Sequence, residues 1–160
     1  MRHILSAIVE NRPGVLARVA GLFSARGFNI ESLAVGPTEV PSRSRMTIVV
    51  DGDDSVVEQV RKQLEKLIDT LKVIELAELP RVERELALVK LKVLPAKRGE
   101  VMTLVEVFRG KVVDVSEKTM IVEASGTGEK LSAFLRMLKP FGILETARTG
   151  CIALKRSTID

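Results

Sequence analysis

The sequence predicts an α+β fold that consists of two tandem βαββαβ domains, and three observations predict it. Apolar runs and amphipathic segments follow one another in the order strand, helix, strand, strand, helix, strand over the first 79 residues. Pro80 and the charged stretch Arg81–Glu85 then interrupt the pattern. Downstream the same order of elements recurs, as a repeat of element order and not of residue identity. We therefore place the domains at residues 1–79 and 80–160.

The first domain is predicted from the spacing of its apolar residues. Helical segments carry them at i, i+3, i+4 and i+7, whereas strands carry them in short runs or at alternate positions. Gly27 has the position of a glycine that ends a helix. The predicted elements are, in order, a strand Ile4–Val9, a helix Val15–Arg26, strands Ile30–Val35 and Arg45–Val50, a helix that Asp53 or Asp54 caps and that carries the apolar stripe Val57, Val60, Leu64, Leu67 and Leu71, and a strand Val73–Leu79. Two helices on one face of such an antiparallel sheet form the ferredoxin-like arrangement.

The second domain is predicted in the same way. Its first strand alternates apolar and polar residues, so that one of its faces is apolar. The predicted elements are a strand Leu86–Val93, a helix Arg98–Phe108, strands Lys111–Val115 and Met120–Ala124, a helix Thr127–Leu138, and strands Ile143–Ala147 and Cys151–Leu154. This order predicts a second ferredoxin-like domain.

The composition is that of a globular protein with an aliphatic core. Hydrophobic residues make up 46% and charged residues 29% of the chain, with five Phe and no Tyr or Trp. No apolar run has the length of a membrane span or of a signal peptide, so we expect a cytoplasmic protein that does not bind membranes. The single Cys151 lies in an apolar run, which favours a buried, inert thiol.

The net charge of +4 raises the question of nucleic acid as a partner. However, Lys and Arg are dispersed among acidic residues, as in RVEREL and RKQLEKL. No Phe lies in a pattern that would stack bases on an open sheet. A solvated surface of mixed charge explains the balance, and we expect no nucleic-acid partner.

The residues needed for catalysis or for a metal site are not found in the sequence. His3 is the only imidazole, and neither a Ser-His-Asp set nor a metal-spaced cluster can be assembled. The loop Ser125–Lys130 lacks the full spacing of the Walker motif, which favours a simple loop before a capped helix. Acidic residues at the start of a helix, such as Asp53, are ordinary partners of the helix dipole. An independent enzyme is therefore not expected.

One segment nevertheless has the pattern of a binding site. In the turn Asn11-Arg12-Pro13-Gly14, Pro13 offers no amide hydrogen and Gly14 has no side chain to block approach. The backbone amides of Gly14, Val15 and Leu16 should face solvent or a ligand. Free amides at a helix N-terminus, together with the helix dipole, favour a carboxylate or a phosphate.

Two Asn residues flank the same predicted helix. Taken singly, Asn11 can brace the turn and Asn29 can follow a glycine C-cap without any function. Taken together, they offer amide oxygens that accept hydrogen bonds from an ammonium group, while the helix amides donate to a carboxylate. A zwitterionic amino acid is the ligand that this pattern indicates.

These residues carry a family resemblance. ENRPGVLARVAGLFSARGFNIESLAVGPTE, SRMTIVV, VERELALVKLKV, VFRGKVVDVS and ARTG, in this order, resemble the ACT domain and, more narrowly, the small subunit of acetohydroxyacid (acetolactate) synthase. The resemblance covers nearly the whole chain. It implies a regulatory, non-catalytic subunit that forms a homodimer through its ACT domains and joins a catalytic large subunit of branched-chain amino-acid biosynthesis. The family's thiamine diphosphate, Mg and FAD would lie on that large subunit, and this chain would hold no cofactor.

The resemblance also implies the roles of the site residues. Valine, or another branched-chain amino acid, would bind between two ACT domains, raising and feedback-inhibiting the activity of the partner enzyme. Its carboxylate would meet the amides of Gly14, Val15 and Leu16. Its polar end would be held by Asn11 and by Asn29 of the paired domain, with Ile30 beside the apolar side chain. Because one methylene changes binding by only about 1–3 kcal/mol, discrimination among valine, leucine and isoleucine should be modest.

Two alternative functions follow from the same residues. A freestanding ACT-type sensor could act on another enzyme or on a promoter, although no helix-turn-helix segment is found. A nucleic-acid binder on a ferredoxin-like sheet would rest only on the basic pI and the fold.

Overall fold

The computed structural model describes residues 1–158, which form two compact units. Unit 1 comprises Met1–Val82 together with the chain from Cys151 onward, and unit 2 comprises Glu83–Gly150. The predicted division at 79/80 lies close to the first boundary. The C-terminal segment differs, because the predicted second domain runs to residue 160 whereas the structure groups this segment with unit 1.

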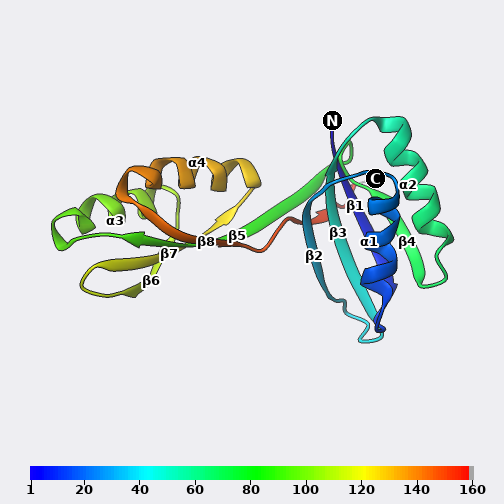
Figure 1. The fold of residues 1–160 in the computed structure, drawn as a ribbon, viewed down its shortest axis with the longest axis horizontal. Helices are drawn as coiled ribbons and strands as arrows, with labels where there is room; N and C mark the ends of the chain where they lie inside the picture. Colours follow the sequence, from blue (N-terminus) through cyan, green and yellow to red (C-terminus); the bar gives the residue numbers. More distant parts are fainter. Residues whose placement is uncertain (159–160) are drawn as a thin grey trace. The chain divides into compact units, whose positions relative to one another are not determined.

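Unit 1 is built on a four-stranded antiparallel sheet (Figure 1). Its strands are β1 (Arg2–Glu10), β2 (Ile30–Pro37), β3 (Arg43–Asp51) and β4 (Thr70–Glu75), in the spatial order β2-β3-β1-β4. The long apolar strand β1 lies in the middle, where both of its edges are paired. Strand β2 lies at one edge of the sheet. This arrangement confirms the ferredoxin-like prediction for the first half of the chain.

The helices α1 (Val15–Ala25) and α2 (Asp54–Lys66) cover one face of this sheet (Figure 1). Their buried residues, among them Val19, Phe23 and Leu64, pack on the alternate residues Leu5, Ala7 and Val9 of β1 and on their neighbours in β3. Gly27 follows α1 with φ +71°, as predicted for a glycine that ends a helix. Asp53 caps α2 by accepting a hydrogen bond from the backbone N–H of Ser55 at 2.8 Å.

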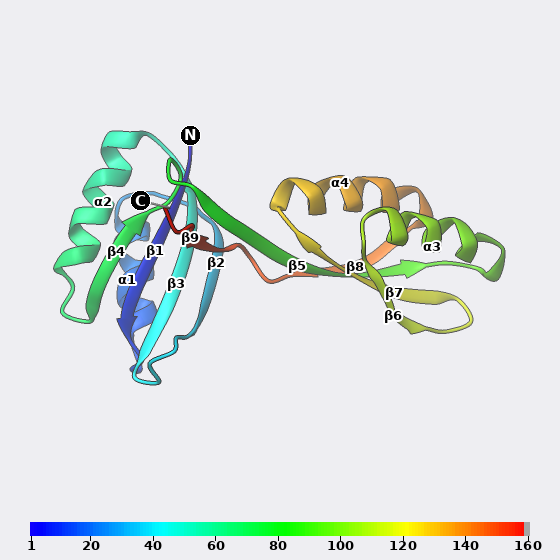
Figure 2. The ribbon, with the colours of Figure 1, turned by 180° about the vertical axis from the view of Figure 1, so that it is seen from behind.

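The opposite face of the sheet receives the C-terminal segment. Strand β9 (Ile152–Lys155) lies on this face (Figure 2) and pairs with β5 (Arg81–Lys92). Cys151 and Ala153 are buried against Ile4, Val49 and Leu76. Apolar residues on this second face of β1 and β3 need cover, and the end of the chain supplies it, which explains why the C-terminal segment belongs to unit 1.

Unit 2 repeats the same order of elements. Besides the part of β5 that lies in this unit, its elements are α3 (Arg98–Val107), β6 (Lys111–Val115), β7 (Thr119–Gly126), α4 (Gly128–Leu138) and β8 (Ile143–Arg148), with short 3₁₀ turns η1 (Pro95–Lys97) and η2 (Lys139–Phe141). The strand order is β6-β7-β5-β8, all antiparallel. Phe134 of α4 is fully buried among aliphatic residues and contacts Phe108, with ring centroids 5.1 Å apart.

The predicted elements and the structure differ at the end of α2. The predicted stripe runs on to Leu71, but α2 ends at Lys66 and Leu71 lies exposed in β4. The last predicted strand of the first domain likewise starts earlier and ends at Glu75 instead of Leu79. A helical period and the start of a strand overlap here, so periodicity alone places the boundary too late.

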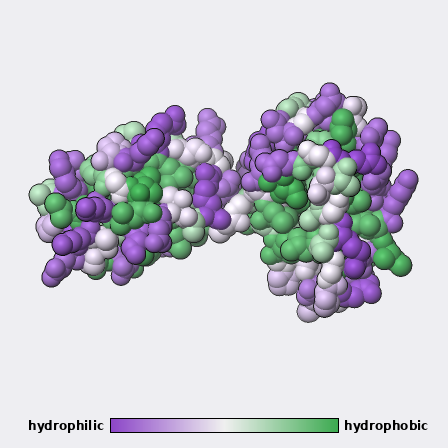
Figure 3. Space-filling model, in the orientation of Figure 1, coloured by the Kyte–Doolittle hydropathy of each residue, from purple (hydrophilic) through white to green (hydrophobic). Residues whose placement is uncertain are grey.

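The surface mixes hydrophilic and apolar residues. In the view of Figure 3, hydrophilic side chains are spread over both units, with smaller apolar areas between them. Exposed apolar side chains include Ile68 in unit 1 and Met102, Val107 and Met137 on the helices of unit 2. Apolar surface of this kind is available to partner proteins. Within residues 1–158, no helix has the length and apolar character needed to span a membrane.

Candidate effector site

The turn before α1 ends in a glycine with a positive φ. Gly14 is the N-cap residue and has φ +85° and ψ −14°, a left-handed conformation that favours glycine. No side chain caps this helix, and its first turn contains no acidic residue. The first intrahelical bond runs from the N–H of Arg18 to the Gly14 carbonyl at 3.1 Å. The preceding amides, including those of Val15 and Leu16, therefore have no acceptor within the helix.

Asn11 is exposed at the end of β1 and braces the neighbouring loop. Its Nδ2 donates to the Pro41 carbonyl at 3.2 Å, and its backbone N–H donates to the Ser42 carbonyl at 2.9 Å. The Oδ1 atom of Asn11, which is the acceptor of the amide, takes no part in these contacts. The bracing role and the binding role are thus compatible, since they use different atoms of one side chain.

Arg18 is a member of this site that the sequence analysis missed. A Cβ atom added to Gly14 would lie 3.0 Å from Arg18 Nη1, so the guanidinium group lies directly beside the turn. Its Nε and Nη2 each lie 2.8 Å from Oδ2 of Asp69, a residue with 4% exposure. The spacing of one helical turn from Gly14 was a signal in the sequence, but the partner Asp69 was not predictable, because it is 51 residues away.

Asn29 and Ile30 lie at the other end of α1. Asn29 is exposed, and Ile30 is half-buried at the start of β2. Because α1 has 11 residues, its two ends are about 16 Å apart. Within one chain, the structure therefore brings together Asn11, Gly14, Val15 and Leu16 but not Asn29 and Ile30. One small amino acid cannot reach both groups in a single copy.

The other loop that might suggest a phosphate site is an ordinary helix start. Thr127 caps α4 by accepting a hydrogen bond from the Lys130 N–H at 3.2 Å. The Lys130 ammonium group turns back to the Ser125 carbonyl at 2.9 Å. These contacts agree with the interpretation of the loop as a cap.

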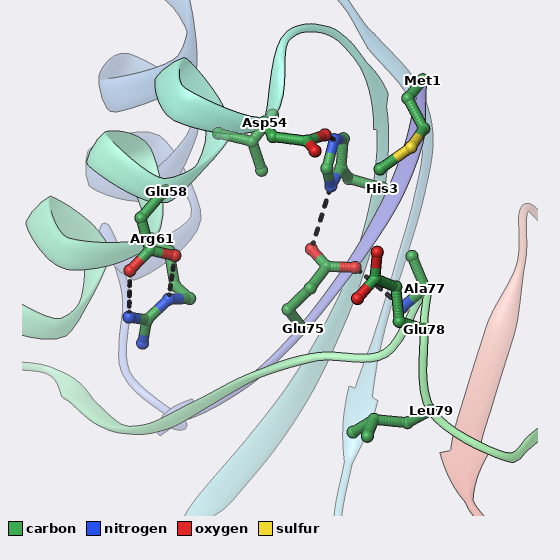
Figure 4. A pocket seen from close by; sticks show the side chains of 10 residues that line it. Met1, His3, Asp54, Glu58, Arg61, Glu75, Ala77, Glu78 and Leu79 are labelled. Atoms are coloured by element: carbon green, nitrogen blue, oxygen red, sulfur yellow. Dashed lines mark hydrogen bonds and ion pairs between the residues drawn. The ribbon is translucent and has the colours of Figure 1, made fainter.

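A separate pocket of about 310 Å³ lies beside the N-terminal end of β1 (Figure 4), and none of the predicted site residues lines it. The buried His3 imidazole lies between two carboxylates, with Nε2 3.0 Å from Asp54 Oδ1 and Nδ1 3.5 Å from Glu75 Oε2. Hydrogen bonds from the Arg61 guanidinium group hold the pKa of the exposed Glu58 below its usual range. Acidic and basic groups of this pocket largely pair with one another.

Among residues 1–158, no group of three or more His, Cys, Asp or Glu side chains is arranged to hold a metal ion. Cys151, the single cysteine of the sequence, is buried with 1% exposure, as predicted.

Comparisons with known proteins match both units. A family model described as an AHAS small subunit-like ACT domain matches residues 5–72, where AHAS stands for acetohydroxyacid synthase. A second model, described as the small subunit of acetolactate synthase, matches residues 84–157. The first match begins within β1 and the second ends after β9, with residues 73–83 between them.

Individual relatives agree with these models. The acetolactate synthase small subunit of Mycolicibacterium smegmatis is 54% identical over 96% of this chain and 91% of its own length. That of Aquifex aeolicus is 53% identical over 97% of this chain and 81% of its own length. The crystal structure of the acetolactate synthase small subunit from Thermotoga maritima is 44% identical, with a TM-score of 0.91 over 99% of both chains. The chain therefore belongs to the family of acetolactate synthase small subunits and carries an N-terminal ACT domain.

Proposed function

We propose that this protein is the regulatory subunit of an acetolactate synthase. It binds valine or a related branched-chain amino acid, and it both activates and feedback-inhibits a catalytic large subunit. It performs no catalysis itself. In this proposal the large subunit holds the thiamine diphosphate, Mg and FAD, and the complex works in the cytoplasm.

The observation that carries the effector part of the proposal is the uncapped N-terminus of α1. Its free amides follow Asn11 by only a few residues along the chain, and the Asn11 Oδ1 is not used in the contact with Pro41. Hydrogen-bond donors for a carboxylate and an acceptor for an ammonium group are thus next to one another. An α-amino acid carries both groups on a single carbon atom, so it can present them to such a site together.

A homodimer would complete the site, and the topology indicates how. The Asn11 contacts with Pro41 and Ser42 place the start of α1 at the same end of the sheet as the β2–β3 loop, near the end of β2. Asn29 lies at the start of β2, whose outer edge is unpaired within the described chain. Two β2 strands that paired antiparallel about a two-fold axis would bring Asn29 and Ile30 of one copy to the Gly14 turn of the other.

Regulation follows if the effector binds one state of the complex more tightly than another. A ligand held by two copies favours the arrangement in which both are correctly placed. Linkage then requires the catalytic subunit to change the affinity for valine in return. The exposed apolar side chains of the helices in unit 2, such as Met102 and Val107, provide surface for a large partner.

The first test combines binding and activity. Valine is titrated into the purified chain by calorimetry, and acetolactate formation by the cognate catalytic subunit is followed with and without the chain and with and without valine. We expect valine to bind, the chain to raise activity, and valine to reverse that increase. A chain that binds none of valine, leucine or isoleucine would contradict the effector assignment, and a chain without effect on the catalytic subunit would contradict the regulatory one.

A mixing experiment tests whether two copies share the site. The Asn11→Ala and Asn29→Ala variants should each lose valine binding while keeping their fold and their activation of the enzyme. In a mixed dimer of the two variants, one site has lost both Asn side chains and the other is intact. We expect about half of the valine sites to return in such a mixed dimer. If mixing restores none, the two residues do not belong to one shared site.

A further inference from the structure

The Arg18 guanidinium group is fixed from one side and free on the other. Its Nε and Nη2 are both engaged with Asp69 Oδ2 at 2.8 Å. Its Nη1 lies beside Gly14, where an added Cβ would come within 3.0 Å. Arginine presents donors in a rigid fork, so pinning two nitrogens determines where the third one points.

Asp69 is placed to hold this group in position. It lies in the segment between α2 and β4, and its side chain is 5% exposed. A second cation, Arg12, lies farther from it, with Nη2 3.8 Å from Asp69 Oδ1. A buried carboxylate needs a partner of opposite charge, and Arg18 provides it at hydrogen-bond distance. The pair therefore ties α1 to the segment between α2 and β4.

We infer that Arg18 is an effector-binding residue whose Nη1 donates to the carboxylate of the bound amino acid, and that Asp69 is the residue that positions it. The inference rests on the proposed effector site at Gly14. The helix amides and the guanidinium group then approach one anion from two directions. A charged donor adds more to carboxylate binding than another neutral amide does.

Arg18 also explains the choice of ligand class. An amine without a carboxylate would bring its ammonium group toward Asn11 but would leave Nη1 of Arg18 without an acceptor. Electrostatic repulsion between the two cations would add to that loss. The site should therefore reject simple amines and amino-acid amides more strongly than the helix amides alone could do.

The test measures this discrimination in matched variants. Arg18→Gln and Arg12→Gln each remove one positive charge near Asp69, but only the first removes the group beside Gly14. Each variant and the unmodified chain are titrated with valine and with valinamide, which keeps the ammonium and isopropyl groups and lacks the carboxylate. Circular dichroism and urea unfolding confirm that the variants are folded.

In the unmodified chain, valine should bind far more tightly than valinamide. Arg18→Gln should weaken valine binding about 10- to 100-fold and leave valinamide binding nearly unchanged. The ratio of the valine affinity to the valinamide affinity should therefore fall by the same factor. Arg12→Gln should change the preference by less than about threefold. If Arg18→Gln weakens both ligands equally, Arg18 is only a structural brace and the inference is overturned.

The role of Asp69 is tested by a double variant. Asp69→Asn should weaken valine binding because Arg18 is no longer held, although residue 69 does not touch the ligand. Arg18→Gln/Asp69→Asn should bind valine no more weakly than Arg18→Gln alone, since both changes remove one shared interaction. Additive losses would overturn the positioning role. An unmodified chain that binds no branched-chain amino acid would instead overturn the proposed function, and this inference with it.

Discussion

Gly14 is the position at which a single methyl group should test both the stability of unit 1 and its ligand site. Its φ of +85° is left-handed, and a residue with a Cβ adopts this conformation at a cost of about 1–2 kcal/mol. The new Cβ would also lie 3.0 Å from Arg18 Nη1. Relief of this close contact would move the guanidinium group away from the turn. We expect Gly14→Ala to lower the free energy of unfolding by about 1–2 kcal/mol and to weaken valine binding about tenfold or more.

Gly21 provides the control within the same helix. It lies inside α1, where an added Cβ meets no atom within 4 Å. Because glycine in a helix interior is less favourable than alanine by about 0.5–1 kcal/mol, Gly21→Ala should stabilise unit 1 by that amount. It should leave valine binding unchanged. The same chemical change thus has opposite effects on stability at two positions seven residues apart.

The assay is urea unfolding followed by circular dichroism, with valine calorimetry on the same samples. For a domain of this size, each kcal/mol corresponds to roughly 4–8 °C in Tm, so the two variants should be clearly separated in thermal scans as well. A Gly14→Ala variant that is as stable as Gly21→Ala would refute the argument from backbone conformation. A stable fold with undiminished valine binding would refute the placement of the ligand at this turn.

Three further outcomes are expected. Hydrogen bonds from the Ser55 hydroxyl and N–H hold the pKa of Asp53 below its usual range, so its contribution to stability is present above the unfolded-state pKa of about 4 and is lost as pH falls through the folded-state pKa. Between these two pKa values, the free energy of unfolding measured with urea should fall less steeply with falling pH in Asp53→Asn than in the unmodified chain. Thr127→Ala removes the cap of α4 and should cost about 1 kcal/mol, with Thr127→Ser restoring most of it in the same unfolding assay. Phe134→Ala empties a fully buried position and should cost about 3–5 kcal/mol, whereas a loss under about 1 kcal/mol would show that the core of unit 2 closes around the gap.

Most of the fold was predictable from local pattern. Helices and strands differ in the period of their apolar residues, and Asp53, Thr127 and Gly27 mark helix ends by chemistry that acts over a few residues. The end of α2 was not predictable in this way, because Leu67 and Leu71 continue a helical period into a strand. There, pairing of β4 with β1 outweighs the local preference.

The candidate site was predictable only in part. The Gly14 turn and its free amides follow from residue types in sequence, since Pro13 has no amide hydrogen and Gly14 adopts a positive φ without a Cβ clash. The contact of Asn11 with the Pro41 carbonyl and the pairing of Arg18 with Asp69 join residues that are 30 and 51 positions apart. No local pattern contains such information.

The sequence by itself thus determined the two βαββαβ units, the presence of a Pro-Gly turn before the first helix and the family to which the chain belongs. The tertiary structure alone decided that the C-terminal strand covers unit 1, that Arg18 is held beside Gly14, and that Asn11 contacts the Pro41 carbonyl. The physical reason is the separation along the chain of the residues that each kind of interaction joins. Periodicity, capping and turn preferences act between near neighbours in the chain, whereas burial and charge pairing join whichever residues the folded sheet brings together.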